Sequence, residues 1–133
     1  MATIKRFEDI EAWRKARALS IKVYEVTNLP DFSKDWALKN QVRRSSGSVM
    51  DNIAEGFERD GKAEFIYFLS IAKGSNGEVR SQLHRALDQG YIDQNTYKLI
   101  IDLSNEIGKM ISGLIAYLNK TGIKGSKYKG RNP

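Results

Sequence analysis

The residues able to do chemistry are few in this chain of 133 amino acids. Cysteine is absent and His84 is the single histidine, which excludes thiolate nucleophiles and cysteine-based metal sites. A lone histidine such as His84, with Asp88 four residues later, is more often a partly exposed hydrogen-bonding residue than a general base. The Glu-x-x-His repeats that hold carboxylate-bridged metals in helical bundles are also missing. We therefore expect no enzyme, no metal and no cofactor.

A second group of polar residues has helical spacing. Ser48, Asn52 and Glu55 occupy positions i, i+4 and i+7 of one segment, beside an apolar stripe. Glu78 and Gln82 of a later segment have the spacing needed to join them. Buried carboxylates invite a functional interpretation, but polar side chains inside bundles more often set register and subunit specificity. The pattern predicts a structural polar network of Ser48, Asn52, Glu55 and Glu78.

Positive charge is concentrated at the two ends of the chain. The net charge is +6, from 22 Lys and Arg against 16 Asp and Glu. Residues 1–7 and 123–133 contain no acid, whereas the segments between them are balanced. Residues 121–133 are rich in glycine and lack apolar periodicity, which predicts a flexible basic arm. The arm contains four cations that could contact nucleic-acid phosphates: Lys124, Lys127, Lys129 and Arg131. A solubilising tail explains the arm equally well.

Two clusters of cations are the best candidates for a basic face on the folded body. Lys39, Arg43 and Arg44 lie within two helical turns, and Arg14 and Arg17 lie close together earlier in the chain. We expect these five residues to contact nucleic-acid phosphates. The alternative is a solvated surface on which the arginine stems cover apolar neighbours.

Apolar residues recur at helical spacing in four windows, and no window alternates as a strand would. The first predicted helix ends at Asn28-Leu29-Pro30, because the residue before a proline avoids helical geometry. The second begins near Ser33 as its cap and ends near Gly56. The predicted core positions of these two helices follow spacings of three and four: Ala12, Ala16, Leu19, Val23 and Val26, then Leu38, Val42, Ser45, Val49 and Ile53.

The third helix is predicted from about Lys62 to Gln89 with Asp60 as its cap, and the fourth follows Asp93 as its cap. Their core positions again follow helical spacing: Phe65, Leu69, Ala72, Asn76, Val79, Leu83 and Ala86, then Ile100, Ser104, Ile107, Ile111, Leu114 and Leu118. Long helices joined by short loops favour antiparallel neighbours. The sequence predicts an all-α fold, an antiparallel up-down-up-down four-helix bundle over residues 1–120.

The longest uncharged run, Met110 to Asn119, is about half as long as a membrane span requires. Residues 1–9 have no apolar core of a signal peptide. We expect a cytoplasmic protein that does not contact a membrane.

Three segments carry a family resemblance: residues 7–16, 41–57 and 64–75. The most specific part is Asn-Ile-Ala-Glu-Gly at 52–56, preceded by the Arg43-Arg44 pair. Together they resemble the four-helix-bundle family of 23S ribosomal RNA intervening-sequence proteins, which is related to the accessory variability determinant proteins of diversity-generating retroelements. The shared residues fall on Trp13, Arg43, Arg44, Asn52, Glu55, Gly56 and Glu78. This chain departs from the family pattern at residues 45–47 and 76–77.

The resemblance implies a homopentamer with a basic surface that binds nucleic acid, and for the retroelement branch a partner that is a reverse transcriptase. Our leading hypothesis is a non-enzymatic homo-oligomer, a pentamer, that binds RNA through backbone phosphates. Few aromatic residues are exposed where they could stack bases, which argues against a stacking platform for single strands and predicts low sequence specificity. The alternative is a protein-interaction scaffold or an accessory subunit of a nucleic-acid enzyme such as a reverse transcriptase, with Ile66, Tyr67 and Ile71 as its interface.

Overall fold

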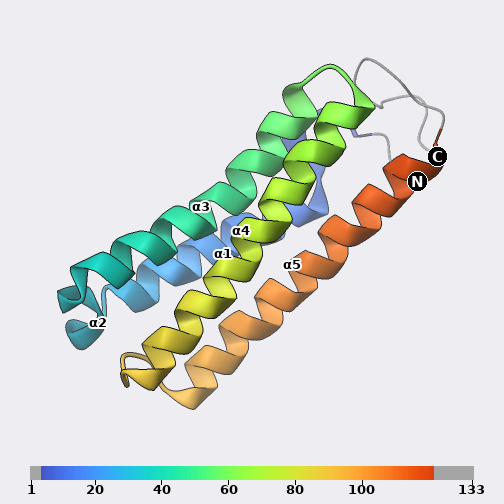
Figure 1. The fold of residues 1–133 in the computed structure, drawn as a ribbon. Helices are drawn as coiled ribbons and strands as arrows, with labels where there is room; N and C mark the ends of the chain where they lie inside the picture. The colour runs from blue at the N-terminus through green and yellow to red at the C-terminus, as the bar shows by residue number, and fades with distance from the viewer. Residues whose placement is uncertain (1–3, 122–133) are drawn as a thin grey trace.

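The computed structural model describes residues 4–121, and within that range it contains helices and no strand (Figure 1). Four long helices pack around one core, each antiparallel to the next, with α1 contacting both α3 and α5. The predicted all-α bundle is therefore confirmed. The helices are η1 (Phe7–Asp9), α1 (Glu11–Thr27), α2 (Pro30–Lys34), α3 (Trp36–Glu58), α4 (Lys62–Asp88) and α5 (Gln94–Lys120).

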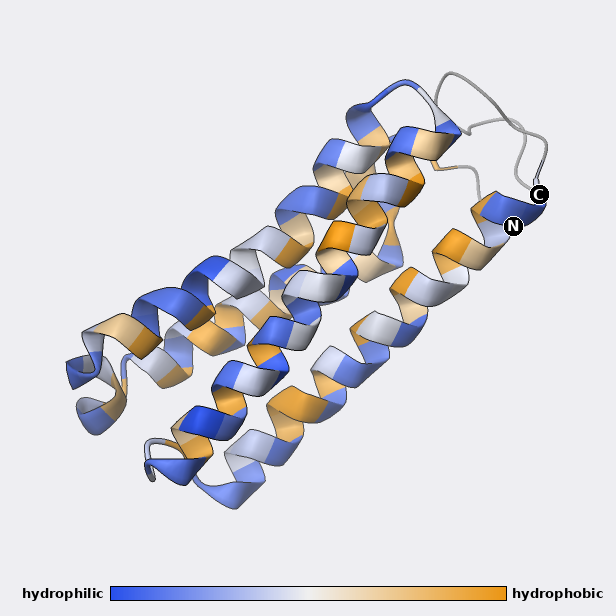
Figure 2. Cartoon of the chain, in the orientation of Figure 1, coloured by the Kyte–Doolittle hydropathy of each residue, from blue (hydrophilic) through white to orange (hydrophobic). Residues whose placement is uncertain are grey.

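The predicted apolar stripes form the core. All the core positions expected on the first three helices are buried, and so are those of the fourth apart from Leu114, which is half-buried. Figure 2 shows apolar and hydrophilic residues alternating around the long helices, as one-sided burial requires. Within residues 4–121, none of the helices combines the length and apolar composition of a membrane span.

The second predicted helix is divided in two, which corrects the expected start at Ser33. Ser33 lies inside α2, where its hydroxyl donates to the Pro30 carbonyl at 2.9 Å. Asp35 breaks the helix and is the true cap of α3, because its carboxylate accepts from the Leu38 backbone N–H at 3.1 Å. Pro30 fits the first turn of α2, since a proline lacks only an N–H that would have no partner there.

Of two other predicted helix caps, one is confirmed and one is wrong. Asp93 caps α5 as expected: its carboxylate accepts from the Thr96 backbone N–H at 2.8 Å, and this bond lowers the pKa of Asp93. The prediction for Asp60 is wrong, because Gly61 is the residue that caps α4 and no side chain accepts there. Gly90 ends α4 with a φ of 74°, in the left-handed region that favours glycine.

Aromatic packing closes the end of the bundle at which α2 lies. Phe32 is fully buried and stacks on Tyr91 with ring centroids 5.2 Å apart. The Tyr91 hydroxyl donates to the Asp35 carboxylate at 3.0 Å, and this hydrogen bond raises the pKa of Tyr91. The α2 segment is thereby connected to the turn between α4 and α5.

Helices α3 and α4 form the closest pair, and their approach depends on small residues. Ser48 and Ser75 meet across the pair with their hydroxyl oxygens 2.8 Å apart. Nearer the connection between the two helices, a Cβ on Gly56 would lie 2.8 Å from the Phe68 Cβ and 3.1 Å from the Phe65 ring. Only glycine fits at position 56 without separating the helices.

Replacing Gly56 with alanine is expected to destabilise the protein by about 1–3 kcal/mol, because the new methyl group overpacks a rigid contact. Gly47→Ala is the matched control, since nothing lies within 4 Å of the added Cβ. Alanine at that helical position should stabilise by about 0.5–1 kcal/mol. Urea unfolding of both variants measures the difference, and equal effects would contradict the close approach at Gly56.

Candidate nucleic-acid interface

The first predicted basic pair, on α1, is held by neighbouring groups. Arg14 donates to the Glu8 carbonyl at 2.8 Å, and its guanidinium lies 3.7 Å from the carboxylates of Asp9 and of Glu11. Arg17 lies over the Trp13 ring, 5.9 Å from the centroid. Both side chains are exposed, but Arg14 already has two carboxylates beside it. Its positive charge is largely offset for any approaching phosphate.

Arg43, the central residue of the second cluster, fastens α3 to the end of α1. Its Nε donates to Thr27 Oγ1 at 2.8 Å and its Nη2 to Asn28 Oδ1 at 3.0 Å. Its guanidinium also lies 4.3 Å from the centroid of the Tyr24 ring. Arg43 is thus a structural clamp rather than a free cation.

The other two residues of that cluster differ in exposure. Lys39 is half-buried and Arg44 is exposed. Arg44 lines a polar recess of about 210 Å³ between α3 and α4 together with Glu78 and Gln82. An acid within the same recess weakens its attraction for phosphate.

The structure does not bring the two predicted clusters together. Arg43 is level with Thr27, and Arg14 lies thirteen residues further back along α1. At 1.5 Å per residue the clusters are about 20 Å apart along the bundle. The four cations predicted for the basic arm, at 124–131, lie outside the described residues.

The predicted polar network forms only in part. Asn52 Nδ2 donates to the Ser48 carbonyl at 2.8 Å and lies 2.9 Å from Ser48 Oγ, and Ser48 meets Ser75. Glu55 lies on the outside instead, where its carboxylate accepts from Arg59 at 2.7 Å, a bond that raises the pKa of Arg59. Glu78 is exposed and lines the recess between α3 and α4 rather than joining the Ser48–Asn52 group. The expectation for these two carboxylates was wrong because neither lies in the buried seam between the helices.

The fully buried polar contact lies between α4 and α5. Asn76 and Ser104 are both 0% exposed. Asn76 Nδ2 donates to the Ser104 carbonyl at 2.9 Å, and Ser104 Oγ donates to Asn76 Oδ1 at 2.8 Å. Arg80 Nη1 donates to the same hydroxyl oxygen at 3.2 Å. A buried pair therefore anchors a cation at the edge of the α4–α5 seam.

A cationic groove follows that seam, and the sequence analysis missed it. Its volume is about 490 Å³. Three of the residues that line it are cations and none is a carboxylate. The lining residues are Lys73, Arg80, Asn105, Gly108, Lys109 and Ser112. No ion pair is found for Lys73, Arg80 or Lys109 among residues 4–121. We define this as the α4–α5 groove. The available signal was the seven-residue spacing of Lys73 and Arg80, which places both on one side of α4.

The single histidine lies further along the same two helices. His84 is exposed, and the Tyr97 hydroxyl lies 2.8 Å from its Nε2 and 3.0 Å from its Nδ1. The rings meet edge to face with centroids 5.1 Å apart. Within the described part of the chain, no three His, Asp or Glu side chains are grouped so as to hold a metal ion.

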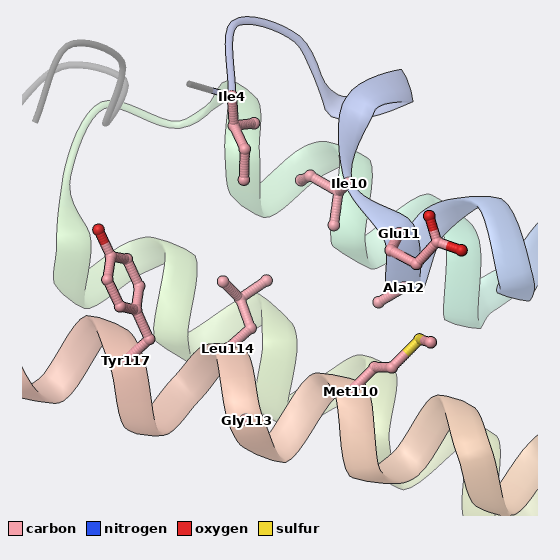
Figure 3. A pocket seen from close by; sticks show the side chains of 8 residues that line it. All are labelled: Ile4, Ile10, Glu11, Ala12, Met110, Gly113, Leu114 and Tyr117. Atoms are coloured by element: carbon pink, nitrogen blue, oxygen red, sulfur yellow. The ribbon is translucent and has the colours of Figure 1, made fainter. Parts of the chain in front are cut away.

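An apolar recess of about 320 Å³ lies between the start of α1 and the last turns of α5. Figure 3 shows Met110, Leu114 and Tyr117 of α5 projecting toward Ile4 and Ile10. Its one charged lining residue is Glu11. This recess is therefore unsuited to phosphate, which leaves the α4–α5 groove as the candidate interface.

The fold and the groove define a class: an antiparallel four-helix bundle with an acid-free cationic groove between two helices. The sequence profile of the 23S rRNA-intervening sequence proteins matches residues 8–113. The chain belongs to that family.

A solved structure shares the fold. It is that of a protein of unknown function from the S23 ribosomal protein family of Bacteroides thetaiotaomicron VPI-5482, similar with a TM-score of 0.74 and 25% identity. The match covers 79% of this chain and 95% of that one. None of the curated proteins matches this chain.

Arg43 and Arg44 are adjacent but differ in their contacts, which allows a matched test. Arg43→Ala should destabilise the protein by about 1–3 kcal/mol, because it removes two hydrogen bonds donated by a charged group. One of them is the hydrogen bond that the buried Thr27 hydroxyl accepts. Arg44→Ala should change stability by less than about 0.5 kcal/mol, as is usual for a surface site. Thermal unfolding compares the two, and equal losses would contradict the clamp.

Proposed function

We propose that this chain is a non-enzymatic, homo-oligomeric RNA-binding protein of the cytoplasm that holds backbone phosphates in the α4–α5 groove. The observation that carries the proposal is the group of three cations without a carboxylate in the lining. Asn105 and Ser112 add neutral hydrogen-bond donors at the same place. Such a combination suits phosphate oxygens, which accept from cations, amides and hydroxyls alike.

The family description supports RNA as the nucleic acid, since it names 23S rRNA. Three phosphate contacts in one protomer give only weak, salt-sensitive binding. Repetition of the groove around a homo-oligomer strengthens binding through avidity, without any new contact. A pentamer, which the family resemblance implies, would present five such grooves.

Exposed apolar surface on α4 supports self-association. Tyr67 of this helix is 62% exposed. Beside Tyr67 on α4, Ile66 and Ile71 are half-buried and add to the apolar surface there. Exposed apolar surface of this kind favours a protein contact. The same surface is also the best support for the second candidate function, a scaffold for another polypeptide such as a polymerase.

Removing two of the groove's cations tests the function directly. In the double variant Lys73→Ala/Lys109→Ala, RNA affinity should fall, and the slope of log K against log salt should become shallower by about 1.4 per protomer. The control is Lys22→Ala/Lys34→Ala, which makes the same charge change on α1 and α2. Fluorescence anisotropy with a short labelled RNA at several salt concentrations measures both.

Two outcomes would contradict the proposal. If the full chain binds no RNA at low salt, the function is wrong. If the groove variant binds as the control does, while a chain ending at Lys120 loses binding, the contact belongs to residues 121–133 and the groove assignment is wrong.

The oligomer is tested by light scattering on the full chain, with the mass of five chains as the expected result. Tyr67→Lys should lower that mass, because it places a charge on the exposed apolar surface of α4. Ala63→Lys, at an exposed position one turn earlier, is the control for the introduced lysine. A single-chain mass for the unaltered protein would contradict the oligomer.

A further inference from the structure

The cationic groove is continued by an aromatic pair. On α4 His84 follows Arg80 by four residues, so it lies on the same side, about 6 Å further along the helix. On α5 the series Tyr97, Ile101, Asn105, Gly108 and Ser112 has spacings of four, four, three and four, which keeps Tyr97 on the groove side. The groove's lining ends at Arg80 and Asn105, and the His84–Tyr97 pair follows on the same side of the two helices.

The His84 ring is both exposed and held in place. Tyr97 is half-buried between the helices, and its hydroxyl is within 3.0 Å of both ring nitrogens of His84. The edge-to-face contact, with 63° between the ring planes, fixes the tilt of the imidazole. A ring whose orientation is already set loses little conformational entropy when another flat ring stacks on it.

Acidic residues near the His84–Tyr97 pair limit how far along the helices phosphates are favoured. Asp88 and Asp93 lie beyond it, toward the connection between α4 and α5. Asp102 also lies on this part of α5 but is paired with Lys98 at 2.9 Å. Phosphates are therefore favoured on the Lys73 side of His84 and disfavoured past it.

We propose that the α4–α5 groove binds a single nucleic-acid strand, with phosphates at Lys73, Lys109 and Arg80 and one unpaired base stacked on the His84 ring. The inference rests on the proposed function and adds the substrate class to it. A cationic groove combined with an aromatic platform is the usual arrangement for single strands. A duplex keeps its bases stacked on one another, so it offers phosphates but no base to His84. In this arrangement Tyr97 is a positioning residue that acts through His84.

The test compares an oligouridylate with an abasic strand that has the same phosphates, and both with a duplex, which has about twice the phosphates but no unpaired base. The full chain is titrated at fixed low salt with an oligouridylate, an abasic strand of equal length and a duplex of equal length. The oligouridylate should bind about tenfold more tightly than the abasic strand, which is the effect of one base–aromatic stack. Affinity for the duplex should be the same in the unaltered chain and in His84→Ala, because no base of the duplex is free to stack on the ring.

Variants assign the effect to the pair. In His84→Ala the ratio of the two affinities should fall to about one, while binding of the abasic strand stays unchanged. Tyr97→Phe removes only the hydroxyl that holds the imidazole and should give an intermediate ratio. Trp36→Ala, which removes an exposed ring on α3 away from the groove, should keep the full ratio.

The outcomes separate this inference from the proposed function. Equal affinity of the unaltered chain for the uridylate and abasic strands, or an unchanged ratio in His84→Ala, overturns the stacked base but leaves phosphate binding in place. Loss of discrimination in Trp36→Ala as well would assign the base to another surface and overturn the inference. Absence of binding to every strand overturns both proposals.

Discussion

The arrangement of the candidate site depends on one buried hydrogen-bonded contact, that between Asn76 and Ser104. Each residue is fully buried, and each supplies a polar group that would lack a partner if the helices were displaced. An unsatisfied buried polar group costs about 1–3 kcal/mol. An apolar seam tolerates small slips along its length, whereas this pair specifies one axial position of α4 against α5. The register that places Lys73 near Lys109, and His84 against Tyr97, follows from it.

The same contact determines how Arg80 is used. Its guanidinium donates to the Ser104 hydroxyl, so one end of a long and flexible side chain is held at the edge of the groove. Two other arginines serve the fold instead: Arg43 clamps α1, and Arg59 pairs with Glu55 and Glu64. Counting cations therefore says little about where phosphate binds.

The sequence predicted the bundle well because each long helix carries its own apolar stripe, a property that needs no knowledge of its neighbours. Caps with a local signal, such as Asp93, were also predictable. The break at Asp35 was not predictable. An aspartate in a helical segment can either continue the helix or cap the next one, and the local sequence does not distinguish the two. The groove could not be found from segment charges either. Lys73 and Lys109 belong to different helices, and the sequence does not state how far one helix is shifted against the other.

The segments between residues 7 and 123 have balanced charges, which by itself argues for a protein scaffold rather than a phosphate binder, but the positions of the carboxylates in the structure weaken that argument. The carboxylates that neutralise α4 and α5 in a sum of charges, Glu78 and Glu106 among them, do not line the groove; Glu106 pairs with Lys15 of α1. The residues nearest to a phosphate in the groove would therefore be its three lining cations. A helix pair of nearly zero net charge can thus still present a cationic site, provided that its acids face other neighbours.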